Sequence, residues 1–409
     1  MTDHLLTLEL WVADRAAVLA LETGDVFYGF AFGADIAGTG EVVFNTSMTG
    51  YQEISTDASY RGQIVVMTYP LINNYGINED DIESRRPWIS GMVVRELAAT
   101  RNNWRMVSDL DAYFSDHDIP GIEGVDTRAL TRTLRTRGPQ RGLLIRAPAS
   151  IANGSDRFTW STGKSPNAVE WAKTQIQAVK NLAPYANHEY VSDVTTLDPY
   201  VADESPWEPW PDPMFREDRP RISLLDVGVK TNIIRSLTRR GCVVTVLPYG
   251  SSVADIEDTN PNGVIVCNGP GDPEQAGQAV ETVRGLIGRF PTMGICLGHQ
   301  VLGLSIGATT SRLPFGHRGA NQPVKDLVSG RAYITSQNHG YQVDASSIPQ
   351  DSGFRVSHIN LNDGSVEGLA HVSLPVFSVQ YHPEASPGPQ DNQYLFDRFL
   401  DLVEKNRIA

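Results

Sequence analysis

The sequence predicts an α/β protein with two unlike domains: an N-terminal β-rich α/β domain, and a C-terminal domain whose mainly parallel sheet has helices on both faces. From Arg221 onward, near-continuous apolar runs alternate with helical stretches, which is typical of buried parallel strands. Residues 1–150 instead alternate short β-rich runs with turns. A length of 409 residues leaves room for two or three domains at roughly 150 residues each.

Short strands and capped helices are expected in the N-terminal domain, residues 1–150. Glu41–Phe44 and Gln63–Met67 are predicted strands, bounded by clusters of glycine and asparagine. Ser108–Phe114 begins a helix with a good capping residue. Asp126–Leu134 begins another, whose leucines lie four residues apart on one face. The domain shows no catalytic constellation of its own, so we expect it to act as a docking surface and as one wall of a site.

Residues 151–220 differ in character and are predicted to form a linker segment with one helix over Ala168–Leu182. Prolines cluster here with two tryptophans, at Pro206, Trp207, Pro209, Trp210, Pro211, Pro213 and Pro220. A recognition segment is the alternative interpretation of this stretch.

The predicted C-terminal domain covers residues 221–409. Its expected strands are apolar runs separated by helices, at Ile222–Val227, Cys242–Leu247, Gly263–Cys267 and Thr292–Ile295.

Composition narrows the class of protein. A formal charge of −14 argues against nucleic-acid or anionic-membrane partners, which require a basic patch. The three cysteines are far apart and lack CxxC spacing, which excludes a disulfide framework or zinc ribbon and suits a reducing compartment. Met1–His4 lacks a secretory pattern, and no apolar run approaches the ~20 residues of a membrane helix. We therefore expect a soluble, cytoplasmic protein.

The clearest chemical motif is Gly294–Gln300, Gly-Ile-Cys-Leu-Gly-His-Gln. It has the G-x-nucleophile-x-G form of a strand-to-helix elbow, with Cys296 as the nucleophile. The positive end of the following helix favours a thiolate, and the N–H of Leu297 is placed to stabilise an oxyanion. A buried structural cysteine is the alternative, which the flanking glycines disfavour; Cys242 and Cys267 lack an elbow and are predicted core residues.

A cysteine nucleophile needs a base and a group that orients it. His382 directly follows the apolar strand Val376–Val379, and strand ends carry the catalytic side chains of open α/β sheets. Glu384, two residues later, can orient the imidazole. A surface His-x-Glu pair is the alternative. His299 lies within the new helix and is predicted to be structural.

Two further loops suit a polar small molecule. Asn268–Pro273 has glycines that allow backbone N–H groups to approach a ligand, although such a loop is often only a turn. Ser336–Tyr341 combines amide side chains with a glycine, although it could also be a hairpin.

Taken in order, Asn-Gly-Pro-Gly-Asp-Pro, Gly-Ile-Cys-Leu-Gly-His-Gln and His-Pro-Glu resemble the class I (triad type) glutamine amidotransferases from Ile222 to about Phe399. The resemblance implies a class I amidotransferase-type sheet. It also implies that Cys296 attacks the glutamine amide to form a γ-glutamyl thioester. His382 would protonate the departing ammonia and then activate water, with Glu384 holding it.

Other motifs resemble the small (glutaminase) subunit of carbamoyl phosphate synthetases. They are Val229–Ile233, Phe315–Val324 and Tyr381–Pro389 in the C-terminal domain, and Phe44–Glu53, Tyr69–Gly76 and Val125–Arg132 in the N-terminal domain. Two departures are noted: Tyr341 replaces a usual phenylalanine, and Arg318 with Gln322 replace more typical histidines.

The resemblance implies a glutamine site that includes Ser47, Gly269, Gly271, Leu297, Gln300, Asn338, Gly340 and Tyr341. It also implies a heterodimer with a large synthetase subunit, which makes carbamoyl phosphate from ammonia, bicarbonate and ATP with Mg. This chain has no Walker-type loop, so ATP chemistry is expected in the partner, and no metal or organic cofactor is expected here.

Two alternatives stay open: an amidotransferase subunit of another synthase, and a non-catalytic interaction subunit. The sequence does not choose between pyrimidine and arginine biosynthesis. Nor does it identify effectors, higher assembly, the ammonia passage or the glutaminase rate without the partner.

Overall fold

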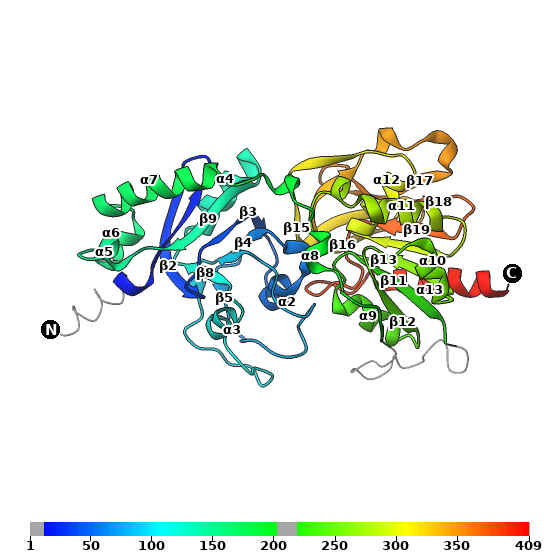
Figure 1. Ribbon diagram of the computed structural model, residues 1–409, viewed down its shortest axis with the longest axis horizontal. Coiled ribbons are helices and arrows are strands. Elements are labelled where there is room, and N and C mark those ends of the chain that lie inside the picture. Colours follow the sequence, from blue (N-terminus) through cyan, green and yellow to red (C-terminus); the bar gives the residue numbers. More distant parts are fainter. Residues whose placement is uncertain (1–11, 203–218, 409) are drawn as a thin grey trace. The chain divides into compact units, whose positions relative to one another are not determined.

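The computed structural model describes residues 12–202 and 219–408, and the chain divides into two compact units (Figure 1). The first unit comprises residues 1–56 and 60–187, and the second comprises residues 57–59 and 188–409. The prolines and tryptophans at 206–213, and the first residues at 1–4, lie outside the described residues.

The first unit is built on a closed barrel with strand order β1-β2-β8-β6-β4-β3-β9. The barrel closes because β9 pairs with both β1 and β3. The predicted strands at 41–44 and 63–67 are confirmed within β3 and β4. The bounds are β1 Ala16–Leu21, β2 Val26–Gly33, β3 Gly38–Asn45, β4 Gln63–Met67, β6 Gly91–Val93, β8 Pro120–Glu123 and β9 Gln140–Arg146. A separate pair joins β5 Leu71–Ile72 and β7 Glu96–Leu97.

Aspartate side chains cap three helices of this unit, at Asp109, Asp126 and Asp156. The carboxylate of Asp126 accepts a hydrogen bond from the N–H of Ala129, as expected for the helix that starts there. For the other predicted helix the capping residue is Asp109 instead of Ser108, so that helix begins one residue later. The helices are α2 Tyr51–Thr56, α3 Leu110–Asp116, α4 Thr127–Arg137, α5 Ala149–Ala152, α6 Arg157–Ser161 and α7 Pro166–Lys180.

The stretch expected to be a linker with one helix is divided between the units. Helix α7 contacts β1 and β9, with Ala168, Ala172 and Val179 buried, so it belongs to the first unit. The second unit takes helix α8 Val191–Val194 and strand β10 Tyr200–Ala202, which pairs with β12. The linker prediction is therefore wrong for residues 151–202. The helix predicted at Ala168–Leu182 is present as α7, which begins and ends two residues earlier.

The second unit carries one sheet with order β10-β12-β11-β13-β14-β19-β18-β17-β15-β16. From β12 to β19 the neighbours are parallel, and beyond β19 they are antiparallel. This mainly parallel half matches the predicted fold class. The strands are β11 Arg221–Asp226, β12 Val243–Pro248, β13 Gly263–Val266, β14 Thr292–Ile295, β15 Thr310–Asp326, β16 Ala332–Val343, β17 Phe354–Asn360, β18 Val366–His371 and β19 Val376–Val379.

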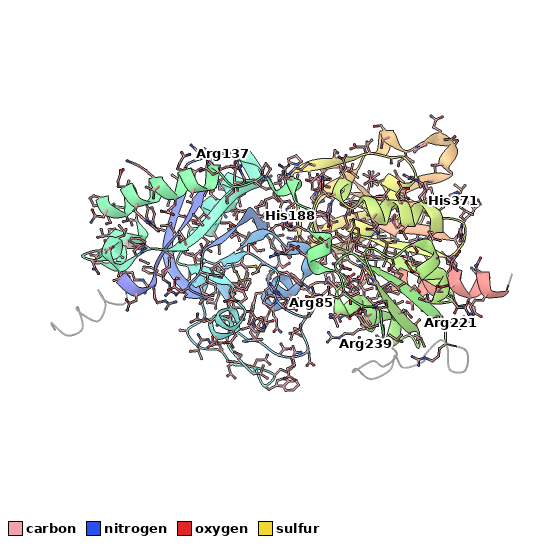
Figure 2. The ribbon with its side chains drawn as sticks, in the orientation of Figure 1. Arg85, Arg137, His188, Arg221, Arg239 and His371 are labelled. Carbon is pink, nitrogen blue, oxygen red and sulfur yellow. The ribbon has the colours of Figure 1, made fainter. Side chains whose placement is uncertain are left out.

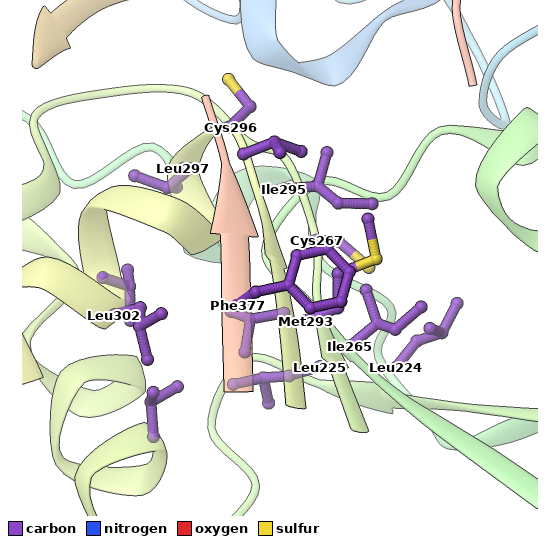
Figure 3. Close-up of a cluster of buried hydrophobic side chains, with 14 of the residues drawn as sticks. Leu224, Leu225, Ile265, Cys267, Met293, Ile295, Cys296, Leu297, Leu302 and Phe377 are labelled. Carbon is purple, nitrogen blue, oxygen red and sulfur yellow. The ribbon is translucent and has the colours of Figure 1, made fainter. Parts of the chain in front are cut away.

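Helices of the second unit pack on this sheet around one large apolar cluster (Figure 3). They are α9 Thr231–Thr238, α10 Val253–Asp258, α11 Gly277–Leu286, α12 Leu297–Ser305 and α13 Tyr394–Ile408. The central strands are buried along their whole length, as expected for parallel strands covered on both faces. None of the helices within the described residues is long and apolar enough to cross a membrane.

The sheet register sets the position of the candidate site. Strands β14 and β19 are parallel neighbours, with Ile295 opposite Val379. Their carboxyl ends therefore meet at one edge of the sheet, where open α/β folds present their reactive groups. Cys296 directly follows β14, and His382 lies three residues after the end of β19.

Candidate active site

Cys296 sits on a strained turn between β14 and α12. Its backbone φ is 54° and its ψ is −105°, a conformation that non-glycine residues rarely adopt. A side chain at Gly298 would overlap the carbonyl oxygen of Val266, and one at Gly294 would lie 2.6 Å from the carbonyl oxygen of Gly298. The two glycines of the motif are thus required for the turn, as a nucleophile elbow demands.

Helix α12 begins directly after Cys296. Leu297 is its first residue, so its N–H has no acceptor within the helix and is available to a developing negative charge. The Cys296 side chain is 2% exposed, and its Sγ lies 3.5 Å from the carbonyl oxygen of Asn338. Figure 3 shows Cys296 and Leu297 at the end of β14.

His382 and Glu384 are joined by a short hydrogen bond of 2.6 Å between Nδ1 and Oε1, and both side chains are buried. Burial lowers the pKa of His382, but the nearby charges of Glu384 and Cys296 outweigh it and raise the pKa to about 10. Nε2 of His382 makes no hydrogen bond of standard geometry among the described residues. The imidazole is therefore held at one nitrogen and free to exchange a proton at the other.

Lys230 completes this arrangement. Its ammonium is 3% exposed, lies 3.1 Å from Oε1 of Glu384 and donates to the carbonyl oxygen of Ala385. Burial raises the pKa of Glu384, but the positive charges of Lys230 and His382 outweigh it and lower the pKa to about 2. The carboxylate therefore stays ionised and keeps orienting the imidazole.

Asn338 and Asn268, from the two polar segments noted in the sequence, are linked by Asp57, which belongs to the second unit. Oδ2 of Asp57 accepts from the Asn338 amide at 3.2 Å, and Oδ1 accepts from the Asn268 amide at 3.4 Å. Asn268 also donates to Ser59 Oγ at 2.9 Å. This bridge fixes the segments that carry Gly269, Gly271 and Gly340. The segment 336–341 proves to be the interior of strand β16 and not a loop, because it pairs with β15.

Two further residues of the predicted glutamine site, Gln300 and Gly269, are held by close contacts within the second unit. Gln300 is buried and donates to the Tyr341 carbonyl at 2.9 Å and to Gln380 at 3.0 Å. Gly269 packs so tightly on Val227 that a side chain there would overlap the Val227 carbonyl oxygen.

Ser47 belongs to the first unit, where it is buried just after β3. Its N–H donates to the Asn45 side chain at 2.7 Å.

The residues expected to be structural behave as such. Cys242 and Cys267 are fully buried in the apolar cluster, and burial raises the pKa of the Cys242 thiol to about 12. His299 is buried with Nδ1 2.9 Å from Ser378 Oγ, and burial lowers its pKa to about 3.

Sequence reasoning missed Lys230 and Asp57. Lys230 stands within the Val-Lys-x-Asn-Ile motif, where a lysine between buried elements is a signal for an ion pair. Asp57 offered no such signal, since an aspartate between helix and turn residues is ordinary.

Comparisons with known proteins agree with this geometry. Residues 223–402 match "Glutamine amidotransferase class-I", and residues 19–144 match "Carbamoyl-phosphate synthase small chain, CPSase domain". The carbamoyl phosphate synthase small chain of Syntrophotalea carbinolica is 49% identical over 96% of this chain and 98% of its own. That of Symbiobacterium thermophilum is 48% identical over 95% and 99%. That of Methanopyrus kandleri is 45% identical over 95% and 99%.

The sequence identity is almost one half over nearly the full length of the chain, and it agrees with the cysteine elbow and the histidine–glutamate pair. This chain therefore belongs to the carbamoyl phosphate synthase small chain family, whose C-terminal part is a class I glutamine amidotransferase.

Proposed function

We propose that Cys296, His382 and Glu384 form a catalytic triad that hydrolyses L-glutamine to glutamate and ammonia for carbamoyl phosphate synthesis. The observation that carries this proposal is the pairing of a strained cysteine elbow with a buried imidazole. That imidazole is anchored by Glu384 at Nδ1 and interacts with the sulfur of Cys296.

In the first half-reaction His382 holds at Nε2 the proton drawn from the Cys296 thiol, and the sulfur attacks the side-chain amide carbon of glutamine. The N–H of Leu297 stabilises the oxyanion of the tetrahedral intermediate. The C–N bond then breaks, and His382 returns its proton to the leaving nitrogen, which departs as ammonia. The product on the protein is a γ-glutamyl thioester.

In the second half-reaction His382 takes a proton from water, whose oxygen attacks the thioester carbon. The C–S bond breaks, glutamate leaves, and the proton returns to the sulfur of Cys296. Glu384 holds the imidazole throughout and stabilises its charged form, a role that Lys230 supports by keeping the carboxylate ionised. Each step uses only groups of this chain and water, so we propose that hydrolysis needs no metal or organic cofactor.

The proposed glutamine contacts combine backbone and side-chain groups around the elbow. The set is Ser47, Gly269, Gly271, Leu297, Gln300, Asn338, Gly340 and Tyr341. Because Ser47 belongs to the first unit, we propose that this unit supplies one wall of the site.

The relatives are named small chains, so we propose a large synthetase chain as the partner of this one. The large chain would take the ammonia, protected from water, and use ATP with Mg and bicarbonate to make carbamoyl phosphate. We propose that the first unit docks on it and that the complex works in the cytoplasm.

The test uses the full chain with a cognate large chain, ATP and bicarbonate, and compares glutamine with free ammonia as nitrogen donor. We expect Cys296→Ala to lose glutamine-dependent carbamoyl phosphate synthesis and to keep ammonia-dependent synthesis. Loss of both activities would point to a broken complex. Retention of the glutamine-dependent activity would overturn the role of Cys296. No glutamine-dependent product from wild type would favour a non-catalytic subunit or another synthase.

A further inference from the structure

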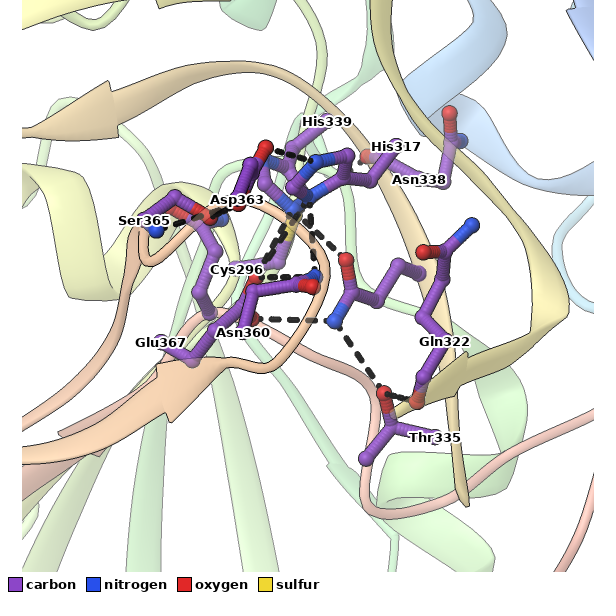
Figure 4. Close-up of polar contacts among 12 residues, drawn as sticks. Cys296, His317, Gln322, Thr335, Asn338, His339, Asn360, Asp363, Ser365 and Glu367 are labelled. Carbon is purple, nitrogen blue, oxygen red and sulfur yellow. Dashed lines mark hydrogen bonds and ion pairs between the residues drawn. The ribbon is translucent and has the colours of Figure 1, made fainter. Parts of the chain in front are cut away.

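A buried polar cluster next to Asn338 takes no part in the proposed hydrolysis (Figure 4). His317 comes from β15, His339 from β16 and Glu367 from β18, and all three side chains are buried. One potential ligand atom of each lies within 4.8 Å of the other two. Oε1 of Glu367 is 3.4 Å from Nδ1 of His317 and 3.8 Å from Nε2 of His339.

In each histidine, the outer ring nitrogen points away from Glu367 and the inner one points toward it. The hydrogen bond of the outer nitrogen shows which nitrogen carries the ring hydrogen. Nδ1 of His339 lies 2.8 Å from the carbonyl oxygen of Tyr341, which only accepts, so this nitrogen carries the hydrogen. Nε2 of His317 likewise donates to the carboxylate of Asp363 at 2.9 Å. In a neutral ring the inner nitrogen then bears a lone pair, and each inner nitrogen faces the Glu367 carboxylate.

Gln337 adds a further oxygen to this group. Its amide nitrogen donates to Oε2 of Glu367 at 3.0 Å and to Thr335 Oγ1 at 3.1 Å, while the Thr335 hydroxyl donates elsewhere, to the Gln322 carbonyl. These contacts fix the amide orientation and leave Oε1 of Gln337 3.1 Å from Nε2 of His339. Two atoms with lone pairs at this distance require a positive group between them, either a metal cation or an extra proton.

The distances and outer contacts suit a zinc ion. Zinc binds imidazole nitrogen and carboxylate oxygen at about 2.0–2.2 Å with tetrahedral geometry, which places neighbouring ligand atoms about 3.4 Å apart. Histidines bound to zinc usually donate their outer N–H to a carboxylate or a backbone carbonyl, as these two rings do. Both oxygens of Glu367 also accept amide hydrogen bonds, since Asn360 donates to Oε1 at 3.2 Å. The Asn360 amide also lies 3.4 Å from Nδ1 of His317, but in the described part of the chain no donor reaches Nε2 of His339.

We propose that Nδ1 of His317, Nε2 of His339 and the Glu367 carboxylate bind a Zn²⁺ ion, with Oε1 of Gln337 as the fourth ligand. The ion would join β15, β16 and β18 in the antiparallel half of the sheet. His339 directly follows Asn338, whose carbonyl contacts the nucleophile sulfur. The ion therefore braces one wall of the active site and takes no step in hydrolysis.

The test measures metal binding and not turnover, so it is independent of the proposed function. It uses the full chain in a Cys296→Ser background, which removes the reactive thiol as a competing ligand. After dialysis against buffer with micromolar Zn²⁺, we expect the protein to retain one equivalent of the ion. The bound ion should raise the midpoint temperature of thermal unfolding. Co²⁺ as the probe should give the visible absorption of a tetrahedral site with nitrogen and oxygen ligands.

Variants separate this site from adventitious binding. His317→Ala and Glu367→Gln should abolish stoichiometric binding and the Co²⁺ spectrum. Asp363→Asn, at the half-exposed edge of the cluster, should weaken binding by about 10–100-fold because it orients His317 from outside. The matched control is His188→Ala, since His188 also pairs with an aspartate, Asp193, but lies outside the cluster (Figure 2).

Three outcomes overturn the proposal: no stoichiometric Zn²⁺ in wild type, binding that persists in His317→Ala, or a loss in His188→Ala as large as in His317→Ala. The first outcome would mean that a proton and not a metal holds the rings together. If Glu367→Gln does not fold, Asp363→Asn still decides, because unchanged affinity in that variant contradicts the proposed role of His317.

Discussion

Two cysteines occupy matching places at the ends of neighbouring parallel strands, yet their surroundings give them different chemistry. Cys267 follows β13 and Cys296 follows β14, and both side chains are buried, at 0% and 2% exposure. Burial raises the pKa of the Cys267 thiol well above its ordinary value, and the charges of Asp226 and Glu384 raise it further. A thiol in that state is a core residue.

Cys296 differs from Cys267 in its backbone and not in its place in the sheet. Its φ of 54° turns the chain sharply, so that helix α12 starts at the next residue. The same turn places the sulfur at the Asn338 carbonyl and near the charge of His382. The comparison indicates that the turn after the strand, and not burial, decides which of the two cysteines suits the proposed role of nucleophile.

The largest expected effect comes from removing the sulfur of the proposed nucleophile, Cys296. Cys296→Ala should lower glutamine hydrolysis by about 10⁴-fold or more, because the covalent route is lost. It should also abolish the fast labelling by a thiol-directed alkylating reagent, which glutamine should slow in wild type. Cys242→Ala is the control and should leave both the rate and the labelling near wild type. Alkylation of Cys242 or Cys267 at the rate of Cys296 would contradict the comparison.

The elbow was predictable because its requirements are local. Glycines two residues before and two after the cysteine permit the close contacts with Val266 and within the turn, and they are visible in the sequence. His382 and Glu384 were likewise found from their place after an apolar strand. The pairing of Ile295 with Val379 then brings the two strand ends together.

What the sequence did not reveal depends on contacts between distant residues. Lys230 and Glu384 are 154 positions apart, and Asp57 reaches Asn268 and Asn338 from more than 200 positions away. Helix α7 was itself predicted, at Ala168–Leu182, but it was placed in a linker because polar and proline-rich stretches flank it. Residues 336–341 were expected in a loop because polar side chains inside a strand break the usual alternation of apolar and polar residues.

The next effect tests the turn itself. Gly298→Ala places a methyl group against the Val266 carbonyl oxygen, so the elbow must shift. We expect glutamine hydrolysis to fall by about 10²-fold, since small displacements of reacting groups have effects of that order. Gly277→Ala is the matched control, because nothing lies within 4 Å of its new methyl group. Equal rates for both variants would show that the turn tolerates the methyl group and is not strained.

A smaller effect concerns the charges around His382. The pKa of Glu384 falls from 4.5 to about 2 on folding, so its stabilisation is complete above pH 4.5 and is lost as the pH falls through about 2. The pKa of His382 rises from 6.5 to about 10, so its stabilisation is complete below pH 6.5 and is lost as the pH rises through about 10. Both contributions are therefore complete between pH 4.5 and 6.5.

Glu384→Gln removes the first contribution, which is at most about 3 kcal/mol at roughly 1.4 kcal/mol per pKa unit. It also lowers the raised pKa of His382, because the charge of Glu384 helps to raise it. Denaturant unfolding of wild type should lose that stability between pH 4.5 and about 2, relative to the variant. Parallel pH profiles, with a constant difference in stability between the two proteins, would show that Glu384 titrates normally in the folded chain.

The smallest effect is expected at Cys267, where the sulfur serves packing alone. Cys267→Ala should cost about 1–2 kcal/mol of stability through the small cavity it leaves, and should keep glutamine hydrolysis near wild type. Cys267→Ser should cost more, because its hydroxyl enters an apolar surrounding without an assured partner. At Cys296, serine and alanine should instead be equally inactive and similarly stable, because the polar Asn338 carbonyl can accept from the hydroxyl. The relative stability of the serine and alanine variants thus distinguishes a cysteine that serves packing from the proposed nucleophile. A Cys267→Ser variant as stable as Cys267→Ala would remove that distinction.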